Sequence, residues 1–290
     1  MLTGRQVGIS WTRPTSNIYT NGSSELFLGE FIQGHRQEVV LATKYTNAAE
    51  GKDPNAGGNH RKSMVQAVEG SLERLRTDYI DLYYLHIWDQ MTPVEEVMRG
   101  FDDLVSQGKV LYVGVSDCPS WWVAQANTLA RLRGWTPFVG LQIEYSLIER
   151  TVERELMPMA KAFNIGVVAW SPLGGGLLSG KYHAASAANA RYSSDMTKAF
   201  MRTGERSDRV IQEVNRISQE IGRSAAQVAL AWLRYRELPV IPIVGARKLS
   251  QLEDNLDSLK LELSPEQVAS LDQASSIEMG FPHDFITWIW

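Results

Sequence analysis

The chain has one cysteine, Cys118, and no apolar run that approaches 18 residues. A single cysteine excludes a disulfide within the chain and suits a reducing compartment. Without a long apolar run we expect no membrane-spanning helix, and residues 1–22 lack the apolar length of a signal peptide. These absences predict a soluble, cytoplasmic protein that does not act at a membrane.

Excess positive charge is also lacking. The 29 Lys and Arg residues stand against 33 Asp and Glu residues, which gives a formal net charge of −4. This balance argues against nucleic acid as the main partner. The 290 residues, 44% of them hydrophobic, are a normal length for one α/β barrel and enough to form a large core without disulfides or metals.

Short apolar runs rich in β-branched residues recur along the chain and alternate with amphipathic helical patterns. The runs are nearly continuous, which is typical of parallel strands covered on both faces. Their alternation at intervals of about 30 residues predicts βαβ units. Strands are expected over 38–44, 79–86, 109–116, 138–145, 164–171 and 238–246. Helices are expected over 60–76, 92–109, 120–134, 151–164 and 224–236, the last with Ser224 as its N-cap.

No glycine-rich turn follows the first clear strand, which ends in ATKYTNAAEG. An open doubly wound sheet that binds a dinucleotide needs such a turn, whereas the glycine-rich stretch SPLGGGLLSGK comes late, at 171–181. This favours a closed (β/α)8 TIM-type barrel. We expect residues 1–290 to form one barrel domain, with 182–208 as a mobile loop near the barrel mouth because they are polar and weakly periodic.

The strand count falls short of eight. Six strands are clear, and a seventh fits the short piece before Tyr19. One βα unit takes about 30 residues, and that length is not available before Gly8. The sequence therefore predicts a barrel that lacks its first βα unit.

Three polar residues stand where a barrel carries its reacting groups, at or near the ends of strands. Lys44 closes an apolar run, so burial should lower its pKa, although a lysine that extends its amine to solvent would fit too. His86 also closes a strand and could be a core or rim residue instead. Tyr19 precedes an Asn-Gly turn, and most tyrosines are packing residues. Together they suggest a tyrosine acid tuned by a lysine, with a neutral histidine to orient a carbonyl oxygen.

Seven motifs in order resemble the aldo-keto reductase family, in the branch that includes the potassium-channel β-subunits. The family is a barrel without a Rossmann fold that reduces aldehydes and ketones with NADPH, so the resemblance implies a small-molecule carbonyl substrate. Two alternatives stay open: an NADPH-binding regulatory or sensor subunit, and a catalytically inactive remnant. The motifs are NIYTNGSSE (17–25), VVLATK (39–44), SLERLRTDYIDLYYLH (71–86), GKVLYVGVSD (108–117), LQIEYSLIER (141–150), VVAWSPLGGGLLSGKY (167–182) and IPIVGARKLSQLEDNL (241–256).

The resemblance assigns roles to individual residues. Tyr19 would donate the proton, Lys44 would tune it and His86 would orient the carbonyl; no metal is implied. The implied contacts with the nicotinamide are Ser116, Asp117 and Gln142 at the amide, where the family usually has Asn in place of Asp117, and Trp170 on the ring. The implied contacts with the rest of the cofactor are Ser171, Pro172, Leu173, Gly175, Gly180 and Lys181 around the pyrophosphate, Gly245, Arg247 and Lys248 at the 2′-phosphate end, and Gln251, Asp254 and Asn255 at the adenosine.

No acid occurs in residues 1–24. The family carries Asp five residues before its tyrosine, where it pairs with the lysine, and Pro14 stands at that place here. Lys44 is therefore expected to be a buried cation without its counter-charge, a loss that typically costs about 3–5 kcal/mol, and no other acid is an obvious replacement. Residues 1–16 are atypical, and the family's N-terminal hairpin is missing. A truncated or corrupted start is favoured over a divergent member that lost activity.

The C-terminal segment GFPHDFITWIW, 280–290, is crowded with aromatic rings. A tail this apolar should not stay solvated. We expect it to pack over the barrel mouth or against a second copy of the chain, and the second case would make the protein a homo-oligomer.

Overall fold

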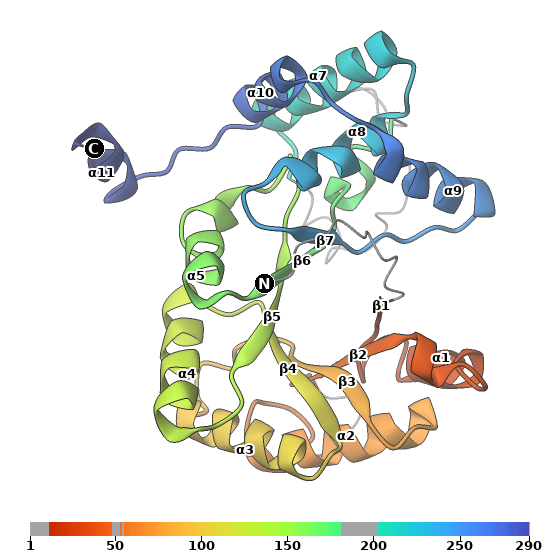
Figure 1. The fold of residues 1–290 in the computed structure, drawn as a ribbon, viewed down its shortest axis with the longest axis vertical. Coiled ribbons are helices and arrows are strands. Elements are labelled where there is room, and N and C mark those ends of the chain that lie inside the picture. Colours follow the sequence, from red (N-terminus) through yellow and green to blue (C-terminus); the bar gives the residue numbers. More distant parts are fainter. Residues whose placement is uncertain (1–11, 48–52, 54, 181–201, 290) are drawn as a thin grey trace. The chain divides into compact units, whose positions relative to one another are not determined.

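The computed structural model describes residues 12–47, 53, 55–180 and 202–289. The chain divides into two compact units, Met1–Leu141 and Gln142–Trp290. Both contain parallel strands that alternate with helices (Figure 1). The predicted α/β class is therefore confirmed.

Among its described residues, the first unit contains four complete strands, each hydrogen-bonded in parallel to the next. Helices cover the outer side of these strands in Figure 1. The register places Lys44 beside Tyr84 and Tyr84 beside Gly114, so the carboxyl ends of the strands lie at one edge. The elements are β1 (Thr12–Pro14), α1 (Ser23–Phe31), β2 (Val40–Tyr45), α2 (Arg61–Leu75), β3 (Ile80–Leu85), α3 (Val94–Ser106), β4 (Val110–Ser116) and α4 (Ser120–Arg133).

The core of this unit explains why these segments take these forms. The rings of Tyr45 and Tyr83 stack at 5.5 Å, and Phe101 of α3 meets both edge-on. Helix α3 buries Val97 and Leu104 on the same stripe as Phe101, as expected for an amphipathic helix against a sheet. The strands and helices predicted in this unit are confirmed, with bounds that differ by up to three residues.

Strand β1 is the short seventh strand expected before Tyr19, and its pairing with β2 continues through Pro14. Its residues pair with β2 as Thr12 with Val40 and Pro14 with Ala42. The N–H of Thr15 donates to the carbonyl of Ala42 at 2.9 Å, and the N–H of Asn17 donates to that of Lys44 at 3.3 Å. Since donors alternate along a strand, the nitrogen of Pro14 faces away from β2, and its missing N–H removes no bond to that strand.

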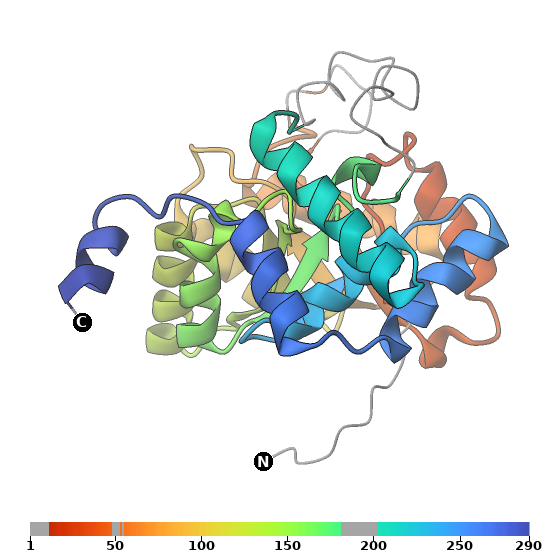
Figure 2. The same cartoon turned by 90° about the horizontal axis from the view of Figure 1, so that it is seen from above.

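The second unit follows β5 (Phe138–Glu144), which carries the chain across the boundary. Strands β6 and β7 pair in parallel, and α7 and α10 lie side by side (Figures 1 and 2). Ser224 caps α8 through a reciprocal capping box with Gln227, as predicted. The elements are α5 (Leu156–Phe163), β6 (Gly166–Trp170), α7 (Glu205–Ile221), α8 (Ala225–Trp232), β7 (Val240–Pro242), α9 (Leu249–Asp257), α10 (Pro265–Ala274) and α11 (His283–Ile289).

Three predicted segments of this unit need correction. The helix expected over 151–164 begins later, because α5 starts at Leu156 after a short 3-10 turn at Thr151–Glu153. The strand expected over 238–246 is only three residues long, Val240–Pro242, although the N–H of Ile243 still donates to the carbonyl of Ala169 at 2.8 Å. The mobile loop expected over 182–208 ends earlier, because α7 begins at Glu205. Acidic residues in its first turn favour a helix start, and Val210 and Val214 bury one face. Residues 182–201 of that expectation lie outside the described part.

No helix within the described residues is long and apolar enough to cross a membrane.

Candidate active site

Tyr19 lies on a tight turn that follows β1. The N–H of Tyr19 donates to the carbonyl of Ser16 at 3.1 Å, and Thr20 and Asn21 both have positive φ. Tyr19 keeps 40% of its surface exposed, so a small molecule can reach this residue. Its ring centre is 5.0 Å from Nζ of Lys44 and 5.8 Å from the ring of His86. The structure thus brings these three predicted residues together as one group, the Tyr19 cluster.

Lys44 is buried at the end of β2, with 1% of its surface exposed. Its Nζ donates to the backbone carbonyl of Thr15 at 3.0 Å. Burial lowers the pKa of Lys44 to about 8, against an opposing effect of the Asp117 charge. The expected desolvated lysine is confirmed, and a lysine that reaches out to solvent is excluded.

His86 is neutral and its tautomer is fixed by its neighbours. Its Nδ1 lies 3.2 Å from the amide nitrogen of Asn47 and 3.3 Å from the hydroxyl of Ser16. Because an amide nitrogen only donates, Nδ1 accepts and the ring proton sits on Nε2. Burial, and secondly the charge of Lys44, lower the pKa of His86 to about 4. A neutral ring with its proton on Nε2 can donate a hydrogen bond to a carbonyl oxygen.

The pKa of Tyr19 differs from the sequence-based expectation. The sequence predicts that Lys44 stabilises the phenolate and so lowers this pKa, but burial, and secondly the charge of Asp117, raise it above its ordinary value. The expected lowering is wrong for the chain by itself, because desolvation of the phenolate outweighs the nearby lysine. Tyr19 therefore holds its proton at neutral pH, which a proton donor requires.

A buried ion pair supports β2 beside the Tyr19 cluster. Glu25 is fully buried in α1 and accepts a hydrogen bond from the hydroxyl of Thr43 at 2.5 Å. Its second carboxylate oxygen pairs with Nε of Arg74 at 2.7 Å. Since Thr43 directly precedes Lys44, this contact fixes the strand that carries the lysine. Glu25 and Arg74 lie within the motifs that resemble the family, yet their pairing cannot be inferred from one sequence.

Ser116 and Asp117 lie at the end of β4 in the same unit. Ser116 is buried, whereas Asp117 is exposed and has a left-handed backbone, with φ of 46°. The N–H of Trp88 donates to the carbonyl of Asp117 at 3.4 Å. This bond joins the turn after β4 to the loop that follows His86.

In the second unit, Gln142 presents an unused donor. Its side chain is 3% exposed, and its Nε2 has no hydrogen-bond partner among the described residues. A buried amide nitrogen without a partner is uncommon in proteins, and this one can donate to a bound acceptor. Trp170 ends β6 half-buried, and its carbonyl accepts from the N–H of Tyr145 at 3.3 Å.

The glycine-rich segment after Trp170 is a series of tight turns. Ser171 has φ of 53°, and its hydroxyl accepts from the N–H of Gly175 at 2.8 Å. Gly174 has φ of 57°, and a Cβ there would lie 2.9 Å from the side chain of Ile148, so only glycine fits. Pro172 is buried, the carbonyl of Leu173 accepts from the N–H of Gly176, and Gly180 has φ of 75°. Lys181 lies outside the described residues.

Around β7 and α9, two cations are exposed, and two of the three predicted adenosine contacts are engaged in other hydrogen bonds. Arg247 and Lys248 form no salt bridge within the described residues, and Gly245 beside them is exposed. Oε1 of Gln251 accepts from both of their backbone N–H groups, at 3.0 and 3.3 Å. The carboxylate of Asp254 accepts from Ser224 and Gln227 of the α8 capping box, and Asn255 is buried.

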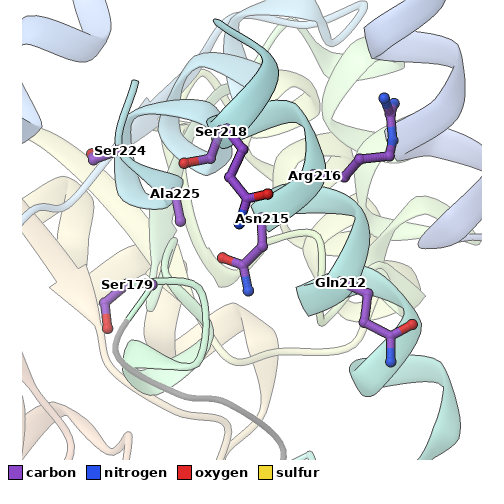
Figure 3. Close-up of a pocket in the computed structure, with 9 residues that line it drawn as sticks. Ser179, Gln212, Asn215, Arg216, Ser218, Ser224 and Ala225 are labelled. Atoms are coloured by element: carbon purple, nitrogen blue, oxygen red, sulfur yellow. The ribbon is translucent and has the colours of Figure 1, made fainter. Parts of the chain in front are cut away.

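A polar cavity of about 610 Å³ borders the end of the glycine-rich segment (Figure 3). Asn215 points from α7 toward the segment that carries Ser179, whereas Arg216 is directed away and pairs with Glu213 and Glu220. The α7 part of the lining was missed, since α7 was not predicted. The lining residues are Ser179, Gly180, Gln212, Asn215, Arg216, Ser218, Gln219, Ser224 and Ala225.

A smaller cavity of about 250 Å³ lies in the first unit, at the starts of α3 and α4. Trp88, two residues after His86, meets Trp121 edge-on at 5.5 Å there. In the described part of the chain, no group of three or more His, Cys, Asp or Glu side chains is placed to hold a metal ion.

Comparison with known proteins identifies the family. The profile of the Aldo/keto reductase family matches residues 7–276. A norsolorinic acid reductase of Aspergillus flavus is 38% identical over 281 residues, which cover 93% of this chain and 69% of that protein. A probable aryl-alcohol dehydrogenase of Saccharomyces cerevisiae is 35% identical, over 94% of this chain and 85% of its own. An aryl-alcohol dehydrogenase [NADP(+)] of Phanerodontia chrysosporium is 37% identical, over 93% and 73%. The chain belongs to the aldo/keto reductase family.

Proposed function

We propose that this chain reduces aldehydes and ketones to alcohols with NADPH, and that Tyr19 is the proton donor. The observation that carries the proposal is the Tyr19 cluster, in which a protonated phenol, a buried lysine and a neutral histidine meet. An acid with a held proton beside a neutral Nε2–H donor suits a carbonyl oxygen that gains negative charge during reduction.

Each residue of the Tyr19 cluster has its own role in the reduction. His86 orients the carbonyl oxygen through Nε2–H, and Tyr19 gives that oxygen its proton. The Lys44 ammonium beside the Tyr19 ring stabilises the phenolate that remains. NADPH, when bound, would supply the hydride to the carbonyl carbon.

The donors in the second unit fit a dinucleotide. The unpartnered Nε2 of Gln142 suits a carboxamide oxygen. The N–H groups from Gly174 to Ser179 already donate within the glycine-rich segment, so a pyrophosphate bound there would exchange with these hydrogen bonds. Gln251 and Asp254 already accept hydrogen bonds from neighbouring residues. A contact with adenosine would therefore use the side-chain NH2 of Gln251 and the remaining lone pairs of the Asp254 carboxylate. The polar cavity beside Gly180 offers further amide and hydroxyl groups.

NADPH is proposed over NADH because Arg247 and Lys248 are exposed cations, which suit a 2′-phosphate. The parent chain should bind NADPH more tightly than NADH in a fluorescence titration. The double variant Arg247→Ala, Lys248→Ala should lose most of that preference, and Lys260→Ala, an exposed lysine further along, should keep it. Equal affinity of the parent for both cofactors would refute the choice of NADPH.

Aromatic aldehydes are the proposed substrate class, since several relatives are named aryl-alcohol dehydrogenases. A suitable test substrate is 4-nitrobenzaldehyde, and its reduction can be followed by the loss of NADPH absorbance. Turnover supports the proposal, and NADPH binding without turnover of any aldehyde contradicts it. The relatives are named as reductases and dehydrogenases, which does not favour a regulatory subunit or an inactive remnant.

We also propose that the chain folds as one domain, a (β/α)8-type barrel. Both units consist of parallel strands followed by helices, as this fold requires. The cytoplasm is the proposed location, on the ground of the single cysteine. Proline at position 14 is proposed to make the chain slower than a relative with the aspartate.

A further inference from the structure

Thr46 has a strained backbone directly after β2, the strand that carries Lys44. Its φ is 105°, and the residue is buried. A β-branched residue rarely adopts a positive φ, and such strain persists only where neighbouring contacts impose it. The hydroxyl of Thr46 accepts from the N–H of His86 at 3.3 Å. The strained residue therefore contacts the backbone of the Tyr19 cluster.

Asn59, which lies just before α2, holds Thr46 in this conformation. Asn59 is fully buried, and its Nδ2 donates to the hydroxyl of Thr46 at 2.8 Å and to the carbonyl of Ile87 at 3.0 Å. Its Oδ1 accepts from the N–H of Asp89 at 2.7 Å. The N–H of the preceding residue, Gly58, donates to the carbonyl of Thr46 at 2.7 Å. The side chain of Asn59 thus joins the segment after β2 to the segment after β3.

The residue after Thr46, Asn47, distinguishes the two tautomers of His86. Its amide nitrogen lies 3.2 Å from Nδ1 of His86 and can only donate. The hydroxyl of Ser16 also lies 3.3 Å from Nδ1, but a hydroxyl can donate or accept and so fits either tautomer. Asn17 supports Asn47 from a second direction, because its Nδ2 donates to the Asn47 carbonyl at 3.0 Å. The position of the ring proton therefore depends on where Asn47 is held.

We infer that Asn59 is a positioning residue for His86. It holds Thr46 in the strained conformation, and Thr46 in turn places the amide of Asn47 on Nδ1, which keeps the ring proton on Nε2. The inference rests on the proposed function, in which Nε2–H orients the carbonyl oxygen. Asparagine suits this place because its amide offers two N–H donors and an acceptor, whereas an aspartate would set an oxygen against the carbonyl of Ile87.

The variant Asn59→Ala tests this role through the 15N resonances of the His86 ring, assigned with His86→Gln. Protonated and unprotonated ring nitrogens resonate far apart, so the two positions report the tautomer without any turnover. At mildly basic pH, where the ring is neutral, the parent should show a protonated Nε2 and an unprotonated Nδ1. In Asn59→Ala the two resonances should move toward each other, because both tautomers become populated.

The matched control is Asn127→Ala, which removes another buried asparagine. Asn127 joins α4 to β5 through two hydrogen bonds with the backbone of Phe138, at 3.0 and 2.8 Å. Its loss should lower the stability of the chain and leave the His86 resonances unchanged. A shift confined to Asn59→Ala therefore separates positioning from a general loss of stability.

A pair of variants at Thr46 gives the same answer should Asn59→Ala fail to fold. Thr46→Val keeps the shape and the β-branch but removes the hydroxyl that Asn59 and the N–H of His86 share. It should move the ring resonances in the direction expected for Asn59→Ala. Thr46→Ser keeps the hydroxyl and should keep the tautomer of the parent.

Kinetics connect the tautomer to the proposed reaction. Asn59→Ala should lower kcat for 4-nitrobenzaldehyde by about tenfold or more, because a displaced hydrogen-bond donor no longer meets the carbonyl oxygen. The affinity for NADPH should stay the same, since the proposed cofactor contacts begin at Ser116.

The outcomes distinguish the inference from the proposed function. A fixed Nε2–H tautomer in Asn59→Ala overturns the inference, whether or not the chain turns over aldehydes. It is also overturned if Asn127→Ala shifts the resonances equally, if Thr46→Ser behaves as Thr46→Val does, or if an active chain keeps its kcat in Asn59→Ala. A mixture of tautomers in Asn59→Ala, in a chain whose parent has no turnover, supports the inference and contradicts the proposed function.

Discussion

Tyr19 is partly exposed and has two close neighbours, Lys44 and His86. We predict that Tyr19→Phe lowers kcat for 4-nitrobenzaldehyde by at least about 100-fold, because the proton donor is removed. The affinity for NADPH should stay nearly the same, since the proposed contacts begin at Ser116. Tyr112→Phe, an exposed tyrosine on β4, is the control and should keep full turnover. A Tyr19→Phe variant as fast as the parent would rule Tyr19 out as the donor.

His86 links the site to the pH dependence of stability. Its pKa is about 4 in the folded chain and ordinarily 6.5, so between these values the unfolded chain binds a proton that the folded chain does not. The contribution of His86 to the free energy of unfolding is fully present above pH 6.5, and it is lost as the pH drops toward 4. At a pH of about 4.5 the loss is on the order of 2 kcal/mol.

The variant His86→Gln tests this linkage, because glutamine keeps a polar side chain that does not titrate. Urea unfolding at about pH 7 and at about pH 4.5 should show a smaller difference in the free energy of unfolding for the variant. His35→Gln, at a half-buried histidine in the turn after α1, is the matched control. An equal difference in parent and His86→Gln would mean that His86 titrates normally.

At the scale of elements, β1 allows a direct test of the strand edge at Pro14. The nitrogen of Pro14 makes no bond to β2, so Pro14→Ala should change the free energy of unfolding by less than about 1 kcal/mol. Thr15→Pro is the matched change one residue on. It removes the N–H that donates to Ala42 at 2.9 Å and should cost about 1–3 kcal/mol, because the buried carbonyl of Ala42 loses its donor. Equal effects in chemical denaturation would contradict the register of β1.

The sequence predicted those elements that have a strong apolar signal. Strands β2 to β6 follow near-continuous apolar runs, and α3 follows a helical stripe. Strand β7 is shorter than its apolar run, because its pairing with β6 ends at Pro242. Helix α7 begins inside a stretch that the sequence pattern predicts as a loop, since its few apolar residues are spaced among many charges.

The site was predictable to a different degree. Tyr19, Lys44 and His86 could be named, because strand ends and family motifs mark them. Their supports could not, since the carbonyl of Thr15 and the side chain of Asn47 become neighbours only through the fold. The direction of the Tyr19 pKa shift depends on how burial balances a nearby charge, and no spacing in the sequence shows that balance.

At the scale of the whole molecule, α11 carries an uncovered apolar surface. Phe281 is 86% exposed and Trp288 is 81% exposed, and Phe285 lies between them with ring centres 6.3 and 6.1 Å away. We predict that this surface binds a second copy of the chain, because aromatic rings so exposed are unfavourable in water. Truncation after Pro282 should lower the mass measured by light scattering. An unchanged mass with a raised KM for bulky aldehydes would place the segment at the substrate instead.

The central claim is that this chain transfers a hydride from NADPH to a carbonyl, with Tyr19 as the acid. The most direct measurement mixes the chain in excess with NADPH and then adds 4-nitrobenzaldehyde, while absorbance at the NADPH band is followed through a single turnover. We predict a fast loss of absorbance in the parent and a loss at least about 100-fold slower in Tyr19→Phe. NADPH that binds to the parent but keeps its absorbance after the aldehyde is added would contradict the claim.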